Sequence, residues 1–245
     1  MILGWKLFCL ETINKNGCKL LIFILDFSYM KKAIYIFLFN CFLFSGNMLI
    51  KGQTIDSVQY KKVYTNFTEA LKEPMKVYRL NLSKMPLDSF PIDLSKFKNL
   101  QYLCVNNDQI EFIPREIEHL QNLKGLELVG QNLKTLPPEF SNLKNLEEIY
   151  LNVNKKTDFT QNVNVLSTIP KLTILHLENG ELMELPGNFS ILTHLEKLYL
   201  NDNKLTDVPE QVNGLKNLKY LDMQHNKVPP IKMSNYQNFG LRVKF

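Results

Sequence analysis

A leucine pattern recurs along most of this 245-residue chain, and its spacing constrains the fold more than any other feature. The stretch LEKLYLNDNKLTDVP begins at Leu195, and related stretches precede and follow it. The seven copies begin at Val77, Leu100, Leu123, Leu146, Leu172, Leu195 and Leu218. Successive starts are 23 residues apart, except that 26 residues separate Leu146 from Leu172. A fixed period in this range predicts stacked supersecondary units rather than one globular core.

The apolar spacing changes within each copy. Leu198 and Leu200 alternate as the inward residues of a short strand would, whereas Leu205, Val208 and Leu215 follow at longer and irregular steps. Neither a surface helix nor a half-buried strand keeps this rhythm. Burial of each leucine contributes roughly 1.5 to 3 kcal/mol, which is too little for one copy to overcome its own chain entropy. The copies must therefore stack on one another.

The unit LxxLxLxxNxLxxLPxxxxxLxx resembles the 23-residue type of leucine-rich repeat, and the chain is similar to short exported leucine-rich repeat proteins of Bacteroidetes. The resemblance covers about residues 77–231. It implies an α/β solenoid, a horseshoe with about seven short parallel strands on the concave face and loops and short helices on the convex face. It also implies binding rather than catalysis.

The copy at Leu146 departs most from this unit. It lacks Leu-Pro and instead carries apolar residues at helical spacing, namely Phe159, Val163 and Leu166. Thr157 or Asp158 is available as an N-cap. We expect a short helix that ends near Pro170. This helix would either form a local bulge or provide a docking site.

An asparagine slot follows each strand, where a buried amide can satisfy backbone groups of the turn. The slot holds asparagine in only three copies, as Asn154, Asn203 and Asn226. The other copies hold Met85, Asp108, Gln131 and Gly180. We therefore expect a broken amide ladder and less regular turns in the N-terminal half.

Each end of a solenoid exposes its core unless a cap covers it. Residues 53–76 are interpreted as an N-terminal helical cap, because the run TNFTEALK from Thr65 to Lys72 is amphipathic and precedes Pro74. Residues 232–245 are interpreted as a C-terminal cap, in which the alternating LRVKF predicts a closing strand.

The N-terminal segment predicts export. Residues 33–50 carry no charge and follow Lys31 and Lys32, so residues 30–52 have the build of a signal peptide with cleavage after Gly52. Alternatively, residues 33–50 form an uncleaved membrane anchor. Both interpretations place the repeats outside the cytoplasm, in the periplasm, at the cell surface or secreted. Residues 1–29 fit neither segment and are interpreted as a mis-assigned upstream extension, with translation starting at Met30.

Composition excludes several kinds of function. The formal net charge of +5 falls to about +1 after residue 52, because the preceding segment holds six of the 29 basic residues and two of the 24 acidic ones. No basic run then remains for nucleic acid. Cys104 is the one cysteine after the leader, so disulfides within the mature chain are excluded.

The sequence contains no catalytic motif and predicts no cofactor and no metal site. His176 and Glu178 would share one face of a strand, but two ligands do not make a closed zinc site. We expect His176 to be a solvated polar residue.

The strand residues that point away from the core predict a binding surface. Between the two core leucines the copies hold Asn81, Cys104, Glu127, Tyr150, His176, Tyr199 and Asp222. Two residues earlier they hold Arg79, Tyr102, Gly125, Glu148, Ile174, Lys197 and Tyr220. Tyrosine is enriched at interfaces because its ring buries a large area with little loss of entropy. The predicted partner-binding residues are Tyr102, Glu127, Tyr150, Ile174, His176, Tyr199, Tyr220 and Asp222.

We therefore expect an exported, non-enzymatic module that binds a protein or peptide on its concave face. The strand face alone offers on the order of 500 Å², less than the ~800 Å² per partner of a stable complex, so a tight partner also needs the rim or a flank. Two alternatives stay open. One is a structural or envelope component that self-associates, and the other is a carbohydrate-binding or hydrolytic protein with an unrecognised pocket.

Overall fold

The computed structural model describes residues 8–13, 19–24, 61–83, 90–107, 109–130, 132–154, 156–229 and 241–245. The chain forms two compact units, Met1–Gln53 and Thr54–Phe245. In the first unit, β1 (Phe8–Ile13) pairs antiparallel with β2 (Lys19–Ile24). Residues 30–52, the predicted leader, lie outside the described residues, and the expectations about cleavage and the start codon stay predictions. None of the described helices has both the length and the apolar character needed to cross a bilayer.

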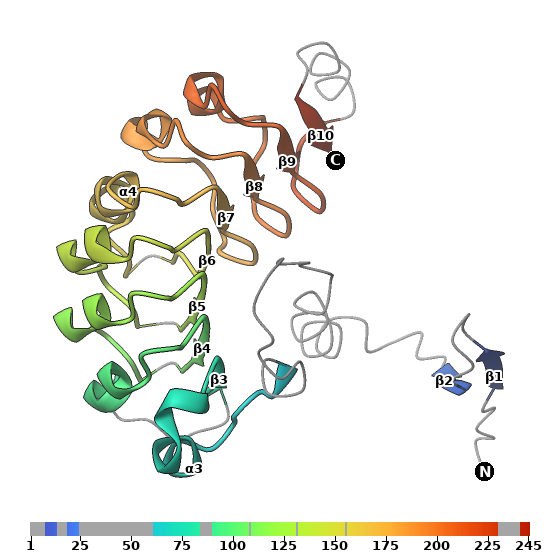
Figure 1. The fold of residues 1–245 in the computed structure, drawn as a ribbon. Helices are drawn as coiled ribbons and strands as arrows, with labels where there is room; N and C mark the ends of the chain where they lie inside the picture. Colours follow the sequence, from blue (N-terminus) through green and yellow to red (C-terminus); the bar gives the residue numbers. More distant parts are fainter. Residues whose placement is uncertain are drawn as a thin grey trace. The chain divides into compact units, whose positions relative to one another are not determined.

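The second unit is built on one open sheet of eight parallel strands in sequential order. The strands are β3 (Arg79–Asn81), β4 (Tyr102–Asn106), β5 (Gly125–Val129), β6 (Glu148–Leu151), β7 (Ile174–His176), β8 (Lys197–Tyr199), β9 (Tyr220–Asp222) and β10 (Arg242–Lys244). Figure 1 shows these strands along the inner side of an arc, with short helices on its outer side. The predicted solenoid of about seven repeat strands is confirmed, and the expected closing strand is present as β10, which pairs with β9.

The register of the sheet is the one that the leucine spacing predicts. Leu198 of β8 lies opposite Leu175 of β7 and Leu221 of β9, and the same column continues through Leu80, Leu103, Leu126 and Ile149. Every member of this column is at most 2% exposed. Because side chains alternate along a strand, the residues on either side of the column face away from the core.

The convex limbs of most repeats are short 3-10 helices. They are η3 (Ile92–Lys96), η4 (Arg115–His119), η5 (Pro138–Asn142), η6 (Gly187–Ile191) and η7 (Glu210–Gly214). A further 3-10 helix, η2 (Pro74–Lys76), precedes the first repeat. In four repeats a proline that follows Leu, Ile or Val is the N-cap of the next helix, with φ between −73° and −59° at Pro114, Pro137, Pro186 and Pro209. A residue whose φ is fixed near −65° favours this change of direction.

The 26-residue copy replaces this limb with α4 (Phe159–Ser167), the helix that its spacing predicts. Asp158 is the N-cap, and its side chain accepts a hydrogen bond from the backbone N–H of Gln161. Val163 and Leu166 are fully buried, and the ring of Phe159 meets that of Phe189 edge to face at 5.9 Å. The three extra residues therefore build a wider helix on the convex side without interrupting the sheet.

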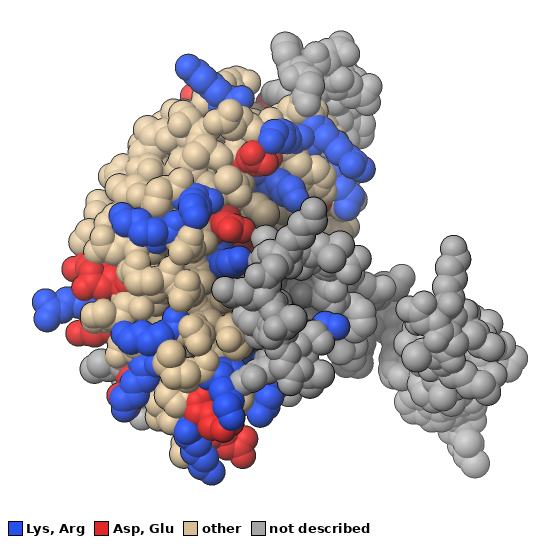
Figure 2. Space-filling model, in the orientation of Figure 1, with Lys and Arg blue, Asp and Glu red and all other residues tan. Residues whose placement is uncertain are grey.

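Charged side chains cover the outside of the repeats. Figure 2 shows Lys and Arg interspersed with Asp and Glu over the face in view. Three exposed ion pairs join residues 23 positions apart on neighbouring repeats, namely Lys134–Glu111, Lys204–Glu181 and Lys219–Glu196. Exposed pairs contribute little to stability, so cohesion between repeats comes from the core.

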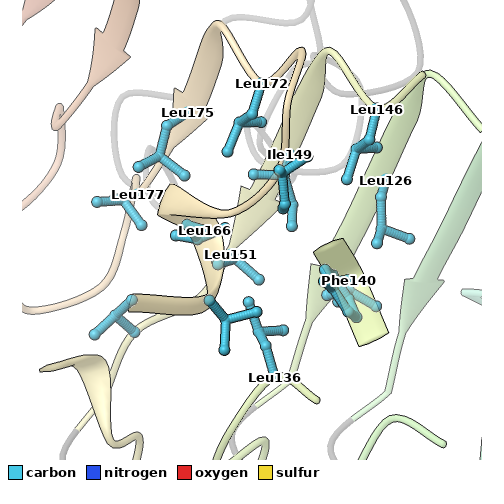
Figure 3. Packing of buried hydrophobic residues seen from close by; sticks show 14 of the residues in the cluster. Leu126, Leu136, Phe140, Leu146, Ile149, Leu151, Leu166, Leu172, Leu175 and Leu177 are labelled. Carbon is cyan, nitrogen blue, oxygen red and sulfur yellow. The ribbon is translucent and has the colours of Figure 1, made fainter. Parts of the chain in front are cut away.

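The core is one continuous apolar column between the sheet and the convex limbs. Figure 3 shows Leu126, Ile149 and Leu175 from the strands above Leu136, Phe140 and Leu166 from the return limbs. Phe97, Phe140 and Phe189 are fully buried. Since each copy packs mainly on its two neighbours, burial is shared along the solenoid.

Both ends of the sheet carry further structure. The helix expected between Thr65 and Lys72 is present as α3 (Phe67–Lys72), with Asn66 as its N-cap. Next to it, Tyr64 forms a parallel bridge to Leu80, which extends the pairing beyond β3. At the other end Val243 of β10 lies opposite Leu221. Leu241, Val243 and Phe245 pack partly buried against the core.

The predicted asparagine slot works as expected in two copies. The Asn203 amide oxygen accepts hydrogen bonds from the backbone N–H groups of Gly180 and Leu182. The Asn226 oxygen accepts one from Leu205. Asn154 differs, because its oxygen accepts from the nearby Lys156 N–H. Met85, Asp108 and Gln131 lie outside the described residues, so the expectation of less regular turns there stays a prediction.

A second asparagine series, which we name the flank ladder, joins the repeats just before each opening leucine. Asn99, Asn122, Asn145 and Asn217 each donate from the side-chain amide to the carbonyl 24 residues earlier, at 2.7 to 2.9 Å. His194 occupies this position before Leu195, and its Nε2 is buried without a hydrogen-bond partner among the residues that the structure describes. The recurring Asn-Leu pair is the sequence signal for this ladder.

Candidate functional site

Four rings from neighbouring strands form a continuous row on the concave face. We name it the aromatic row, and it consists of Tyr150, His176, Tyr199 and Tyr220. The His176 ring stacks on Tyr150 with centroids 3.6 Å apart and on Tyr199 at 4.2 Å. Tyr199 and Tyr220 follow at 5.3 Å in a tilted arrangement. The register places Tyr150, His176 and Tyr199 opposite one another on β6, β7 and β8. Tyr220 lies on the same face of β9, two residues before Asp222, which is the register partner of Tyr199.

His176 is buried, so the expectation of a solvated histidine is wrong. Only 4% of the residue is exposed, because a tyrosine covers each face of its ring. The two ring nitrogens are also engaged. Nε2 lies 2.9 Å from Glu148 Oε1 and Nδ1 lies 3.1 Å from Glu178 Oε1. Glu178 shares the face of His176 as expected, whereas Glu148 comes from the neighbouring strand β6.

The two carboxylates favour a charged imidazole. Burial opposes protonation of His176, but the hydrogen bonds that its ring nitrogens donate to Glu148 and Glu178, together with the negative charge of these carboxylates, outweigh it and raise the pKa of His176 above its ordinary value. Both ring nitrogens can donate when the imidazole is protonated. The buried imidazole therefore lies between two carboxylates and two tyrosine rings, a setting that favours its protonated form.

Burial and nearby charges raise the pKa values of two neighbouring groups. Burial raises the pKa of Glu127, an effect that a hydrogen bond with Cys104 and the charge of His176 reduce and the charge of Glu178 increases. Burial, followed by the charges of Glu148, Glu178 and Glu127, raises the pKa of the Tyr150 hydroxyl above its ordinary value. The same carboxylates therefore act on several groups across β5 to β7.

Asp222 is also buried, at 6% exposure, although the sequence predicts a surface residue. The Tyr220 hydroxyl donates to its Oδ2 at 2.9 Å, and the Lys244 ammonium lies 3.6 Å from the same oxygen. Burial and then this hydrogen bond raise the pKa of Tyr220 to about 12. Asp222 is shielded because Tyr220 and Lys244, from its own strand and from β10, close over it.

The remaining predicted residues lie on the same face and are partly exposed. Tyr102 of β4 lies under the Arg79 guanidinium, which is 4.6 Å from the ring centroid. Ile174 lies between Glu148 and Lys197 in the register. Cys104 is half-buried, with its sulfur 3.0 Å from the Ser83 hydroxyl. The eight predicted residues therefore line one surface, but its centre is more tightly packed than expected.

Two features of this surface were not singled out in the sequence. Glu148 is 28 positions from His176 and becomes its partner only through the strand register. Arg79 covers Tyr102 for the same reason. Glu148 is the diagonal neighbour of His176 on the adjacent strand, whereas Arg79 lies directly opposite Tyr102, so the signal in each case is the cross-strand neighbour. Within the described ranges, no group of three or more His, Cys, Asp or Glu residues has an arrangement that could hold a metal ion.

Comparison with known proteins identifies the architecture. A family model described as Leucine rich repeat matches residues 170–228. A chain in the structure of the Toll–Spatzle complex of Drosophila is 18% identical, with a TM-score of 0.51. This chain has a leucine-rich repeat fold. The match covers 68% of the leucine-rich repeat chain described here and 22% of the chain from the complex.

Two further structures are similar to the leucine-rich repeat chain at TM-scores below 0.5. A leucine-rich repeat protein of Leptospira interrogans is 26% identical, with a TM-score of 0.45, and the match covers 75% of this chain and 58% of that one. Internalin C2 of Listeria monocytogenes is 22% identical, with a TM-score of 0.43 and coverage of 62% and 65%. This chain therefore spans less than two thirds of each of the three relatives. No curated protein sequence matches it.

Proposed function

We propose that this chain is an exported, non-enzymatic module that binds another protein or peptide on its concave face. The fold supports the binding role, because leucine-rich repeat domains are generally protein-interaction modules and solenoids offer extended concave binding surfaces. The chain matched in the Toll–Spatzle structure is itself part of a protein complex.

The observation that carries the proposal is the aromatic row. Tyr199 and Tyr220 are only partly buried, so their edges and hydroxyl groups face the concave side. The rings are fixed in place by stacking on His176 and by the hydrogen bond to Asp222. A rigid aromatic surface loses little conformational entropy when a partner covers it, which is a property of binding hot spots.

A site-specific cross-linking experiment tests the concave location. A photoreactive benzophenone amino acid replaces Ile174, which is partly exposed between Glu148 and Lys197 and makes no side-chain hydrogen bond. The matched control carries the same group at Lys144, exposed at the end of the convex limb of its repeat. After irradiation in the native cell, we expect one protein adduct from position 174 and none from position 144. The reverse result would move the binding surface to the convex side.

The export part of the proposal rests on residues 30–52. We expect N-terminal sequencing of the native protein to begin near Gln53. An intact N-terminus that includes Phe37 to Phe44 would instead favour the membrane anchor. Mass spectrometry of the same sample tests the start at Met30, because peptides from Glu11 to Lys19 would contradict it.

A further inference from the structure

The centre of the concave face has an unbalanced charge. It includes three carboxylates, namely Glu127 of β5, Glu148 of β6 and Glu178, which is the second residue after β7. His176 is the one basic residue within β5, β6 and β7, all of whose residues the structure describes. Even with His176 protonated and Glu127 neutral, this central surface keeps a net negative charge.

The carboxylates that hold His176 also have acceptor capacity left. Glu148 uses Oε1 for both His176 and the Tyr150 hydroxyl, and Glu178 uses Oε1 for His176. Within the described part of the chain, Oε2 of each accepts no hydrogen bond. The two side chains are 24% and 22% exposed, so they are reachable from the concave side. A carboxylate can accept up to about four hydrogen bonds, which leaves room for a donor from another molecule.

Neighbouring groups respond to this excess of negative charge. Besides burial, the charges of Glu148 and Glu178 raise the pKa values of the Tyr150 and Tyr199 hydroxyls. A cation placed over this surface would be attracted by the carboxylates of Glu148 and Glu178. An anion would be repelled, and partial shielding from water strengthens both effects.

Basic residues flank the centre along the sheet. Arg79 of β3 lies on one side, and Lys197, Arg242 and Lys244 of β8 and β10 lie on the other. The charge pattern along the concave face is therefore basic, acidic and basic again. A complementary partner carries a cation at its centre and neutral or acidic groups toward its ends.

We propose that the surface formed by Glu148, Glu178 and the adjoining tyrosines receives a lysine or arginine side chain of the protein partner. The inference rests on the proposed concave binding function and adds the chemistry of the group recognised. The partly exposed ring of Tyr199 would contact the aliphatic stem of that side chain, while Oε2 of each carboxylate accepts from its ammonium or guanidinium group. His176 acts as a positioning residue, because it fixes both carboxylates.

A random 12-residue peptide library displayed on phage, selected on the immobilised full chain, provides the probe. We expect the selected peptides to be enriched in Arg or Lys at one position. Replacement of that residue by Gln in a synthetic peptide should weaken binding about tenfold, equivalent to about 1.4 kcal/mol. The double variant Glu148→Gln, Glu178→Gln should bind the two peptides equally. Glutamine keeps the size of each side chain, and circular dichroism checks the fold.

The matched control is Glu184→Gln, Glu210→Gln, which removes the same charge from exposed residues outside the strands and should preserve the tenfold difference. If the selected peptides show no preference for Lys or Arg, the inference about a cation is wrong. The proposed concave binding function still holds in that case, provided that Tyr199→Ala, Tyr220→Ala abolishes binding of the peptides. Peptides that bind this tyrosine variant normally, or a selection that yields none, would contradict both proposals. The peptide substitution on the unmodified chain decides the matter even if the glutamine variant fails to fold.

Discussion

The ring of Tyr150 lies face to face with the imidazole of His176, at a centroid distance of 3.6 Å and an interplanar angle of 15°. This contact joins β6 to β7 on the side of the sheet opposite the leucine core. The concave face therefore contributes to folding as well as offering a surface. The residues that cover His176 therefore contribute to stability, whereas fully solvated strand residues contribute little.

Tyr150→Ala is predicted to lower the free energy of unfolding by about 1 to 3 kcal/mol, less than the loss for a fully buried aromatic residue. The reason is that it removes the cover from a buried imidazole that is held by two carboxylates. Urea denaturation followed by circular dichroism measures the change. Phe112→Ala is the control, because Phe112 is 59% exposed, and it should cost less than about 0.5 kcal/mol. If Tyr150→Ala and Phe112→Ala lower the free energy of unfolding equally, Tyr150 stabilises the fold no more than an exposed ring does.

The raised pKa of His176 predicts a pH-dependent stability. The folded protein binds this proton more tightly than the unfolded chain, whose histidine has an ordinary pKa of about 6.5. The contribution is therefore fully present below about pH 6.5 and is lost as the pH rises through the folded-state value. The groups that face the ring are Glu148, Glu178, Tyr150 and Tyr199.

His176→Gln tests this effect, because the titrations of groups distant from the aromatic row are common to both proteins. We expect the wild type to be more stable than the variant below about pH 6.5 and the difference to shrink at alkaline pH. A difference that stays constant or grows with pH would mean that the buried imidazole is neutral.

His194→Asn is predicted to stabilise the protein by about 1 kcal/mol. The asparagine would restore the flank ladder by donating to the carbonyl of Pro170, 24 residues earlier, as Asn217 does to Thr193. Burial lowers the pKa of His194, so protonation in the unfolded chain destabilises the wild type below about pH 6.5 and the gain should be larger there. Thermal midpoints at acidic and neutral pH measure this. A destabilised variant would show that the imidazole packs better than an amide at this position.

Leu175 and Leu200 are fully buried, and each change to alanine should cost about 2 to 5 kcal/mol. Because the repeats couple mainly to their neighbours, unfolding should also become less cooperative. Urea denaturation measures both variants, and the slope of the free energy of unfolding against urea concentration reports the cooperativity. A loss below about half a kilocalorie for either one is incompatible with the core described here.

The sequence was sufficient to predict the sheet and its register. Leu198 and Leu221 are separated by one repeat, and identical spacing in each copy forces them opposite each other. The helix α4 was equally predictable, because Phe159, Val163 and Leu166 recur at helical steps after an N-cap. Both predictions depend on local periodicity, which a single sequence displays directly.

Burial on the concave face was not predictable in the same way. His176 and Asp222 occupy the slot of solvated residues, and they become buried only because Tyr150, Tyr199 and Tyr220 fold over them. These contacts depend on side-chain conformations across several strands. Periodicity indicates which way a side chain points but not what closes over it.

The central claim, that the concave face binds a protein, is tested most directly by affinity. The measurement is the dissociation constant for the protein cross-linked at position 174, with wild type, Tyr199→Ala, Tyr220→Ala and the convex control Lys134→Ala, Lys144→Ala. We predict at least a tenfold loss, about 1.4 kcal/mol, for the tyrosine variant in its folded state and none for the control. Unchanged affinity for a folded tyrosine variant would contradict the claim.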